Sequence, residues 1–305
     1  MKRYILLMLA VCCLLPSSAQ QSIREISKDP LCLLTPDSAQ KTKQLVILQT
    51  SDTHSRIEPI AVNAADRYAG MGGTVRRATF IKEARKVNPD LLLFDCGDIS
   101  QGTPYYNLFQ GEVEVKMMNL MGYDAMTIGN HEFDFGLENM ARLFRMANFP
   151  VVCANYDVTG TVLEGLVKPY TTFSRNGLKI GVFGLAPKMV QADKCEGVVY
   201  NDPIEVAQKT TDLLKNQEGC DVVICLSHLG YQLKGAPCDE ELAQKTNNID
   251  AILGGHTHTF MKEPAIYLNK DGKNVPVMHT GKSGIYVGML KLTLTEEEEA
   301  QPSSK

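Results

Sequence analysis

Five of the six histidines in this chain stand just after short apolar runs, and each lies near a carboxylate, an amide or a glycine. One Gly-Asp pair also follows a short apolar run. Together, these polar segments are Asp52-x-His54, Gly97-Asp98, Gly129-Asn130-His131-Glu132, Ser227-His228 and Gly254-Gly255-His256-x-His258. Imidazole nitrogens combined with carboxylate and amide oxygens are suitable ligands for divalent metal ions. Each segment alone is also compatible with an ordinary turn or a buried histidine, but together they predict a metal centre.

The runs that precede these segments are expected to be buried β-strands, because they are short, apolar and rich in β-branched residues. They cover residues 44–49, 90–94, 125–128, 151–153, 222–226 and 249–253. Stretches at 76–87, 104–121, 137–146 and 203–217 are expected to be helices. Ligands of open α/β sheets bind at the carboxyl ends of the strands. The polar segments are therefore expected to converge on one edge.

Two expected hairpins and a closing strand complete the pattern. Residues 170–175 and 178–185 flank Asn176-Gly177, a pair that favours a type I′ turn, and residues 265–269 and 275–279 flank Asp271-Gly272. An alternating strand is expected at 285–294. Strands that alternate with helices, together with hairpins, predict an α/β sandwich with mixed sheets.

The number and type of these ligands suit two divalent cations with open coordination positions. Asp98 is the expected bridge between them, because a carboxylate has two oxygens. One cation is expected to be bound by Asp52, His54 and His258, and the other by Asn130, His228 and His256. Two cations roughly 3.5–4 Å apart turn a bridging water into a hydroxide that attacks a phosphoryl group. The expected chemistry is phosphoester hydrolysis, and the ligands permit zinc, manganese or similar ions.

His131 stands outside both ligand sets and is expected to be catalytic. It can stabilise charge in the transition state or protonate the leaving oxygen. Asp134, three residues later, is expected to orient His131, and its alternative role is the N-cap of a helix that begins at Gly136. The sixth histidine, His279, lies inside a hairpin strand and is expected to be structural or peripheral.

Composition excludes several classes of protein. The chain has 305 residues, of which 44% are hydrophobic and 22% charged, as in ordinary globular proteins. Its net charge of −4 and the lack of a basic block argue against nucleic-acid binding. After the N-terminus no apolar stretch is long enough to predict a transmembrane span. Residues 296–305, which begin with four glutamates, are expected to be a solvated acidic and polar tail.

The N-terminus has the organisation of a signal peptide, with a basic start, an apolar run at 4–15 and Ser17-Ser18-Ala19 as a small-x-small cleavage site. Residues 1–19 are therefore expected to be the signal peptide, 20–42 an N-terminal extension and 43–295 the catalytic domain. The mature protein is expected in the periplasm or the extracellular space. Cys12 after Leu9-Ala10-Val11 leaves a lipoprotein anchor as an alternative, although Val11 is bulky for that motif.

Seven cysteines remain after the expected cleavage, so at least one is free. Cys96, Cys153 and Cys225 lie in apolar runs and are expected to be small core residues. Cys195 and Cys238 both lie in expected loops. They are the candidate pair for a disulfide, which export would permit.

The metal-ligand segments resemble those of the calcineurin-like metallophosphoesterases, and within them the 5′-nucleotidase group. The resemblance extends over Gly129-Asn130-His131-Glu132-Phe133-Asp134, and residues 123–134 fit a 5′-nucleotidase signature. It covers the chain from about Val46 to Leu294. It implies a four-layer α/β/β/α sandwich of two mixed β-sheets, the ligand roles given above and a catalytic pair of His131 and Asp134.

The resemblance also implies hydrolysis of phosphate monoesters, with 5′-nucleotides as the expected substrates and nucleotide catabolism as the role. Exported 5′-nucleotidases of this group carry a second, C-terminal domain that holds the nucleoside, and its base-stacking aromatics and arginines have no counterpart here. A separate C-terminal nucleotidase domain is therefore an expected partner. The alternatives are a cyclic-nucleotide or nucleotide-sugar phosphodiesterase, and a metal-binding partner subunit.

Overall fold

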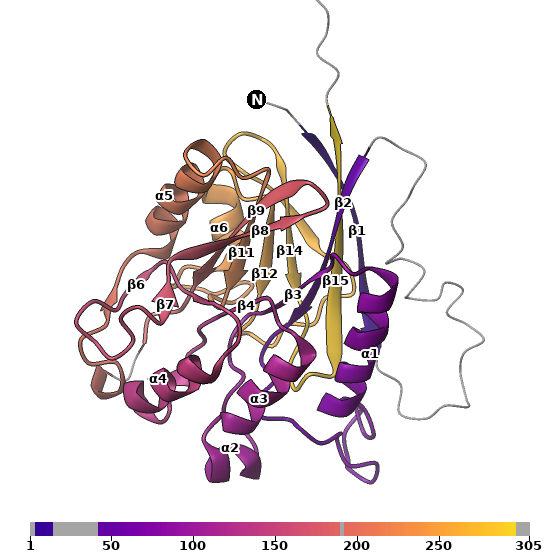
Figure 1. Cartoon of the computed structure of the whole chain (residues 1–305), viewed down its shortest axis with the longest axis vertical. Coiled ribbons are helices and arrows are strands. Elements are labelled where there is room, and N and C mark those ends of the chain that lie inside the picture. Colours follow the sequence, from indigo (N-terminus) through magenta and orange to yellow (C-terminus); the bar gives the residue numbers. More distant parts are fainter. Residues whose placement is uncertain (1–3, 15–41, 190–191, 297–305) are drawn as a thin grey trace, which may run out of the picture.

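The computed structural model describes residues 4–14, 42–189 and 192–296 of the chain. Two β-sheets pack face to face, and helices cover the outer face of each (Figure 1). In spatial order, the first sheet contains β1 (Tyr4–Leu14), β15 (Tyr286–Glu296), β2 (Thr42–Thr50), β3 (Leu92–Asp95), β4 (Ala125–Thr127), β5 (Val151–Val152) and β7 (Val167–Lys168). The second contains β13 (Ala265–Leu268), β14 (Asn274–His279), β12 (Ala251–Gly254), β11 (Val222–Ser227), β9 (Leu178–Leu185) and β8 (Tyr170–Arg175).

The helices divide between the two outer faces. The first sheet is covered by α1 (Thr74–Val87), α3 (Glu112–Met121) and α4 (Gly136–Met146), with the short α2 (Pro104–Phe109) beside α3. The second sheet is covered by α5 (Pro203–Asn216) and α6 (Asp239–Lys245). A small ribbon of β6 (Tyr156–Asp157) and β10 (Val199–Tyr200) stands apart. The expected four-layer α/β/β/α sandwich is thus confirmed.

Strand β2 shows why two sheets and two helical layers form. Successive side chains of a strand point to opposite faces. Leu45 and Ile47 pack between the sheets, whereas Val46 and Leu48 pack under the helices of the first sheet. All four are buried, as expected for a strand that is covered on both faces. The uninterrupted apolar run is therefore a direct consequence of burial on two sides.

Parallel pairing brings the carboxyl ends of the central strands to one edge. Strands β2, β3, β4 and β5 are parallel in the first sheet, and β9, β11, β12 and β14 are parallel in the second. The two predicted hairpins are present as β8 with β9 and β13 with β14, and in each the antiparallel strand lies at the sheet edge. The segments that follow β2, β3, β4, β11 and β12 are those that carry the predicted site.

Two helices differ from the sequence expectation. The predicted helix at 104–121 is broken into α2 and α3, because Gln110 and Gly111 take left-handed φ angles of 53° and 95°. Helix α6 was not predicted, since its seven residues are too few for a clear amphipathic period. Its first turn carries Asp239, Glu240 and Glu241, whose charges favour a helix N-terminus.

At the N-terminus, β1 pairs antiparallel with β15, from Tyr4 opposite Glu296 to Leu14 opposite Tyr286. The predicted cleavage site after Ala19 lies outside the described residues, as does most of the predicted extension and tail. Cleavage there would remove β1 and make β15 the edge strand of the first sheet. No helix in the described part of the chain is long and apolar enough to cross a membrane.

The predicted disulfide between Cys195 and Cys238 is wrong, because no disulfide bond joins these two residues. Cys195 packs beside the hydrophobic cluster under the helices of the first sheet. Cys238 is the N-cap residue of α6, and this helix packs on the outer face of the second sheet through Leu242 and Ala243. Cys96, Cys153 and Cys225 are buried core residues, as predicted.

The contact between the sheets leads to a prediction at Gly184 in β9. A Cβ there would lie 2.0 Å from the carbonyl oxygen of Val152 and 2.4 Å from the hydroxyl of Thr127. These atoms belong to the first sheet, so relief of the clash requires the sheets to separate. We expect Gly184→Ala to lower the free energy of unfolding by about 3 kcal/mol in urea titrations.

Gly181→Ala is the matched control for this prediction. Gly181 lies on the same strand, but a Cβ there meets the flexible end of Leu214 at 3.0 Å and the sulfur of Cys220 at 3.1 Å. Those atoms can shift, so we expect a loss of about 1 kcal/mol or less. Equal losses in the two variants would show that the close contact between the sheets does not limit stability.

Candidate two-metal centre

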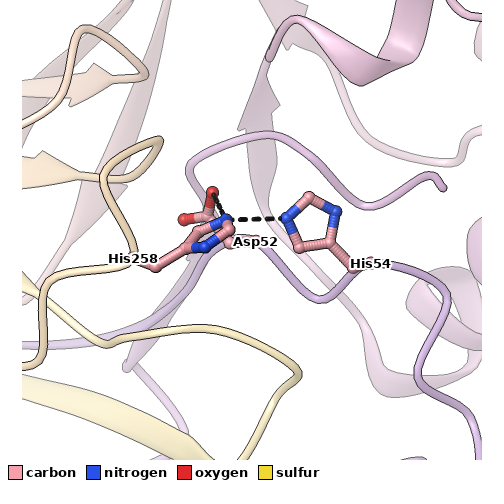
Figure 2. Close-up of side chains that lie close together, drawn as sticks. All are labelled: Asp52, His54 and His258. Carbon is pink, nitrogen blue, oxygen red and sulfur yellow. Dashed lines mark hydrogen bonds and ion pairs between the residues drawn. The ribbon is translucent and has the colours of Figure 1, made fainter. Parts of the chain in front are cut away.

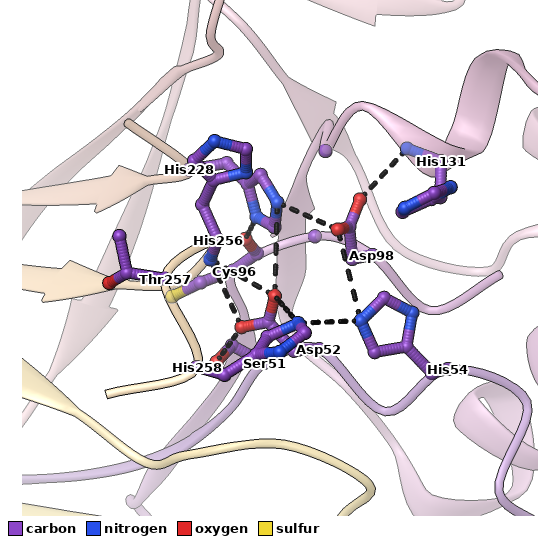
Figure 3. Close-up of polar contacts among 12 residues, drawn as sticks. Ser51, Asp52, His54, Cys96, Asp98, His131, His228, His256, Thr257 and His258 are labelled. Atoms are coloured by element: carbon purple, nitrogen blue, oxygen red, sulfur yellow. Dashed lines mark hydrogen bonds and ion pairs between the residues drawn. The ribbon is translucent and has the colours of Figure 1, made fainter. Parts of the chain in front are cut away.

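The predicted site residues meet at the edge where the two sheets present their carboxyl ends (Figure 3). From the first sheet, Asp52 and His54 follow β2, Asp98 follows β3, and Asn130 and His131 follow β4. From the second sheet, His228 follows β11, and His256 and His258 follow β12. Residues separated by up to about two hundred positions therefore face one another across the sandwich, as the strand-end argument predicted.

Asp52, His54 and His258 form the first group of potential ligands (Figure 2). The Nε2 atoms of His54 and His258 are 2.9 Å apart, and the Nε2 atom of His258 is 3.5 Å from Oδ1 of Asp52. The Nδ1 atom of His54 is 3.1 Å from the carbonyl oxygen of Ser100, which assigns its proton to Nδ1. Two imidazole nitrogens and a carboxylate oxygen thus point to one position, which suits a divalent cation.

Asp98, His228 and His256 form the second group. The Nε2 atom of His228 is 3.1 Å from Oδ2 of Asp98, while its Nδ1 atom is 2.5 Å from the carbonyl oxygen of Cys96. Among the described residues, Oδ1 of Asn130 is a buried atom without a hydrogen-bond partner. Buried polar atoms are normally paired, so a ligand at this position would explain it. The residues present therefore fit a bound cation.

Asp98 lies between the two groups. Its Oδ2 atom is 3.1 Å from Nε2 of His228 in the second group and 4.0 Å from Nε2 of His54 in the first. Its Oδ1 atom accepts the backbone N–H of His131 at 2.9 Å. That hydrogen bond fixes the carboxylate so that one oxygen faces both groups, which is the position that a bridging ligand requires.

The charges of the site also favour cations. The carboxylates of Asp52 and Asp98 are both buried. Burial by itself would lower the pKa of His228, but the adjacent Asp98 carboxylate raises it to about 10. Burial would raise the pKa of Asp98, and the charge of His228 instead holds it well below its usual range. The two buried carboxylates thus need positive charge beside them, and divalent cations would supply it.

Close backbone contacts shape the loops around Asp98. A Cβ on Gly129 would lie 2.2 Å from Oδ1 of Asp98, and a Cβ on Gly97 would lie 2.6 Å from the nitrogen of Gly129. Gly97 also has a φ of 88°, which side chains disfavour. These two glycines let the loops after β3 and β4 touch.

Glu132 holds the same two loops together, a role that sequence reasoning did not assign. Its buried carboxylate accepts the backbone N–H of Gly129 at 2.6 Å, Asp98 at 3.0 Å, Ile99 at 3.0 Å and Ser100 at 3.4 Å. Burial, and then the nearby charge of Asp98, raises the pKa of Glu132 to about 7. Glu132 therefore fixes the backbone of a potential ligand without lying among the ligands.

His131 and Asp134 form a hydrogen-bonded pair beside the second group. The Nδ1 atom of His131 is 2.9 Å from Oδ2 of Asp134. Asp134 is not the N-cap of α4, because Phe135 occupies that position. The side chain of His131 is 31% exposed, so its Nε2 atom is the nitrogen available to a substrate.

His279 is structural, as expected, but it belongs to a buried network that the sequence did not reveal. Its Nε2 atom is 2.7 Å from Oδ2 of Asp239, and the other oxygen of Asp239 accepts the hydroxyl of Ser227. Ser227 in turn accepts the backbone N–H groups of Leu229 and Gly255. The network ties together the ends of β11, β12 and β14. Asp239 gave no signal in the sequence, because it lies in the short helix α6.

Comparison with known proteins agrees with this geometry. The family model of the calcineurin-like phosphoesterases matches residues 45–260, and the chain belongs to that family. A 5′-nucleotidase of Rattus norvegicus is 33% identical over 279 residues, which cover 84% of this chain and 47% of the relative. The chain thus spans about half the length of the curated relatives it matches.

Solved structures of similar proteins superpose on this chain. A 5′-nucleotidase precursor of Thermus thermophilus superposes with a TM-score of 0.73 at 31% identity, over 81% of this chain and 51% of its own. A calcineurin-like phosphoesterase of Bacillus subtilis superposes with a TM-score of 0.68 at 29% identity, over 84% of this chain and 87% of its own. The fold is therefore the one that these phosphoesterases have.

The four hydrogen bonds to Glu132 lead to a prediction. In Glu132→Gln, an amide NH₂ would replace one carboxylate oxygen and face backbone N–H groups that need an acceptor. We expect the free energy of unfolding to fall by about 2 kcal/mol, and metal affinity to fall with it, because the Asp98 loop loosens. Urea titration and equilibrium dialysis with manganese or zinc measure the two effects.

Glu138→Gln is the control, because Glu138 is exposed on the first turn of α4. Its stability and metal affinity are expected to match those of the unmodified protein within about 0.5 kcal/mol. Unchanged metal affinity in Glu132→Gln would mean that this carboxylate does not position Asp98.

Proposed function

We propose that this chain hydrolyses phosphate monoesters, with 5′-nucleotides as the substrates, at a centre of two divalent cations. The observation that carries the proposal is the position of Asp98, which faces both ligand groups next to the partly exposed His131–Asp134 pair. Membership in the calcineurin-like phosphoesterases supports the reaction class. The names of the relatives, which are 5′-nucleotidases, support the substrate class.

In this proposal seven residues bind metal. Asp52, His54 and His258 hold one cation, Asn130, His228 and His256 hold the other, and Asp98 bridges them. Zinc, manganese or a similar ion suits these nitrogen and oxygen ligands. When bound, the cations supply the activation of water and the neutralisation of charge on the phosphate.

His131 acts on the leaving group. Its Nδ1 atom is engaged by Asp134, so Nε2 is free to donate a proton to the leaving oxygen or to stabilise negative charge there. Asp134 holds the imidazole in that orientation. The two residues are therefore the proposed catalytic pair, and they need no direct contact with the cations.

We also propose how the chain is organised and where the protein acts. We propose that residues 1–19 are a signal peptide, that 43–295 form the catalytic domain and that the protein acts in the periplasm or outside the cell, with a lipid anchor on Cys12 as the alternative. Relatives such as the rat enzyme are about twice as long as the matched segment. A C-terminal nucleotidase domain, in this chain or in another, is the proposed partner of the catalytic domain.

A substrate panel tests the function. The metal-loaded chain is assayed on a 5′-mononucleotide, a cyclic nucleotide and a nucleotide sugar, with phosphate release as the readout. We expect turnover of the mononucleotide with manganese or zinc and its loss after chelation, because the ligand groups would be empty. Bound metal without turnover of any substrate would contradict the enzyme and favour the metal-binding partner subunit.

A second test addresses His131. We expect His131→Ala to lower kcat by about 100-fold or more while both cations stay bound, because His131 is not among the proposed ligands. Asp134→Asn is expected to give a smaller loss. Steady-state kinetics and metal analysis by mass spectrometry provide the two readouts. Full activity in His131→Ala would refute its assignment, and loss of a cation would place it among the ligands.

A further inference from the structure

A small polar cavity lies beside the loop that carries Asp52 and His54. It is situated between that loop, helices α1 and α3 and the end of β3, and its polar lining includes Ser55, Arg56, Arg77, Asp95 and Glu114. Its volume of about 10 Å³ is that of one water-sized sphere, which is the least space that a buried water needs. The cavity therefore has room for one water molecule and is too small for an organic ligand.

The side chains that line this cavity carry unpaired polar atoms. Within the described residues, no hydrogen-bond partner is present for Oγ of Ser55, for Nε of Arg56 and Arg77, or for either carboxylate oxygen of Glu114. Ser55, Arg77 and Glu114 are each at most 5% exposed. Buried polar atoms are normally paired with protein groups or with ordered water. Several such atoms around one water-sized cavity point to a common partner.

The charges around the cavity balance, but they do not pair directly. Both oxygens of Glu114 and the Nε atoms of Arg56 and Arg77 lack a hydrogen-bond partner in the described part of the chain. Burial raises the pKa of Glu114, and the nearby Ser55 hydroxyl opposes this rise. Asp95, the other acid of the lining, already accepts two hydrogen bonds. Because two arginines face two acids, a neutral bridging molecule fits this gap better than an ion does.

We propose that one buried water molecule occupies this cavity and bridges Ser55 to Glu114 and Arg77. A water needs two to four polar partners in a site of this size, and these three side chains supply them. The bridge joins α1 and α3 to the loop after β2, which carries the first group of potential metal ligands. Glu114 and Arg77 are then positioning residues for that loop.

The loop needs support on this side because its backbone is strained. Asp52, His54 and Ser55 have left-handed φ angles of 50°, 47° and 51°, which persist only where the surroundings enforce them. On one side, the backbone N–H groups of His54 and Ser55 donate to the carbonyl oxygens of Asp98 and Ile99 at 3.1 and 2.8 Å. The bridging water would hold Ser55 from the other side. Its effect on metal binding rests on the proposed function, whereas the water site does not.

A high-resolution crystal structure of the full chain tests the water directly. We expect one water within about 3 Å of Oγ of Ser55 and of a carboxylate oxygen of Glu114. A cavity without electron density, an ion in place of water, or a direct contact between Ser55 and Glu114 that closes the cavity would overturn the site.

Three variants test the positioning role. Glu114→Leu removes the two acceptors, so we expect loss of the water and about tenfold weaker binding of the cation held by Asp52, His54 and His258, as is typical for residues that support metal ligands. The other cation is expected to bind within about twofold of its usual affinity. Glu114→Gln retains an acceptor and is expected to keep the water and most of the affinity. Glu112→Leu, the control, makes the same change two residues earlier in α3, where the side chain is 37% exposed.

Calorimetric titration with manganese measures both affinities, and the binding step that is lost in His54→Ala identifies the first ligand group. Equal weakening of both steps in Glu114→Leu, no weakening of either, or the same effect in Glu112→Leu would contradict the positioning role. If Glu114→Leu does not fold, Ser55→Ala takes its place, because it removes the hydroxyl that lines the cavity. If the unmodified chain binds no cation, the proposed function fails, and the crystal structure still decides whether the water is present.

Discussion

The structure depends on two buried carboxylates that hold the ends of two sheets together. Asp52 follows β2 in the first sheet, and its oxygens accept the backbone N–H of His256 from the second sheet at 3.0 and 3.1 Å. Asp98 follows β3 and lies 3.1 Å from the imidazole of His228, also from the second sheet. Such charges are costly to bury unless partners surround them. The loops at this edge are arranged to supply those partners, and the same arrangement leaves room for cations.

That arrangement needs an unusual backbone. Five of the potential ligands have left-handed φ angles, namely Asp52 at 50°, His54 at 47°, Asp98 at 55°, His256 at 75° and His258 at 51°. Each such residue costs about 1 kcal/mol or more and persists only where its surroundings enforce it. Glu132 holds the loops after β3 and β4, and the Ser227–Asp239–His279 network holds the ends of β11 and β12. Rigid supports thus offset the strain at the candidate site.

The separation of roles within the site has a structural basis. Asp52, Asp98 and His228 are buried at the bottom of the site, whereas His131 and Asp134 are partly exposed just before α4. Clefts lie on both sides, one at His131 and one at His258. In the proposed function, the residues that bind cations and the residue that acts on the leaving group are therefore different.

Sequence alone determined much of this picture. A strand that is buried on both faces appears in the sequence as a continuous apolar run. The potential metal ligands directly follow such runs, and ligands of open α/β sheets bind at the carboxyl ends of strands. The sequence therefore predicted which side chains would converge. The hairpin turns and the main helices were also predicted, since their signals are local. The Asp98 position between two ligand groups was expected from the chemistry of a carboxylate, and the distances agree with it.

Tertiary structure decided the rest. The break between α2 and α3, the short helix α6 and the separation of Cys195 from Cys238 depend on packing between distant segments, which no local pattern records. The supporting roles of Glu132 and Asp239 arise because their carboxylates meet groups from other loops. Five of the potential ligands adopt the left-handed conformation, which residues other than glycine rarely take. Only the closed sandwich, through its many simultaneous hydrogen bonds, makes that conformation the stable one.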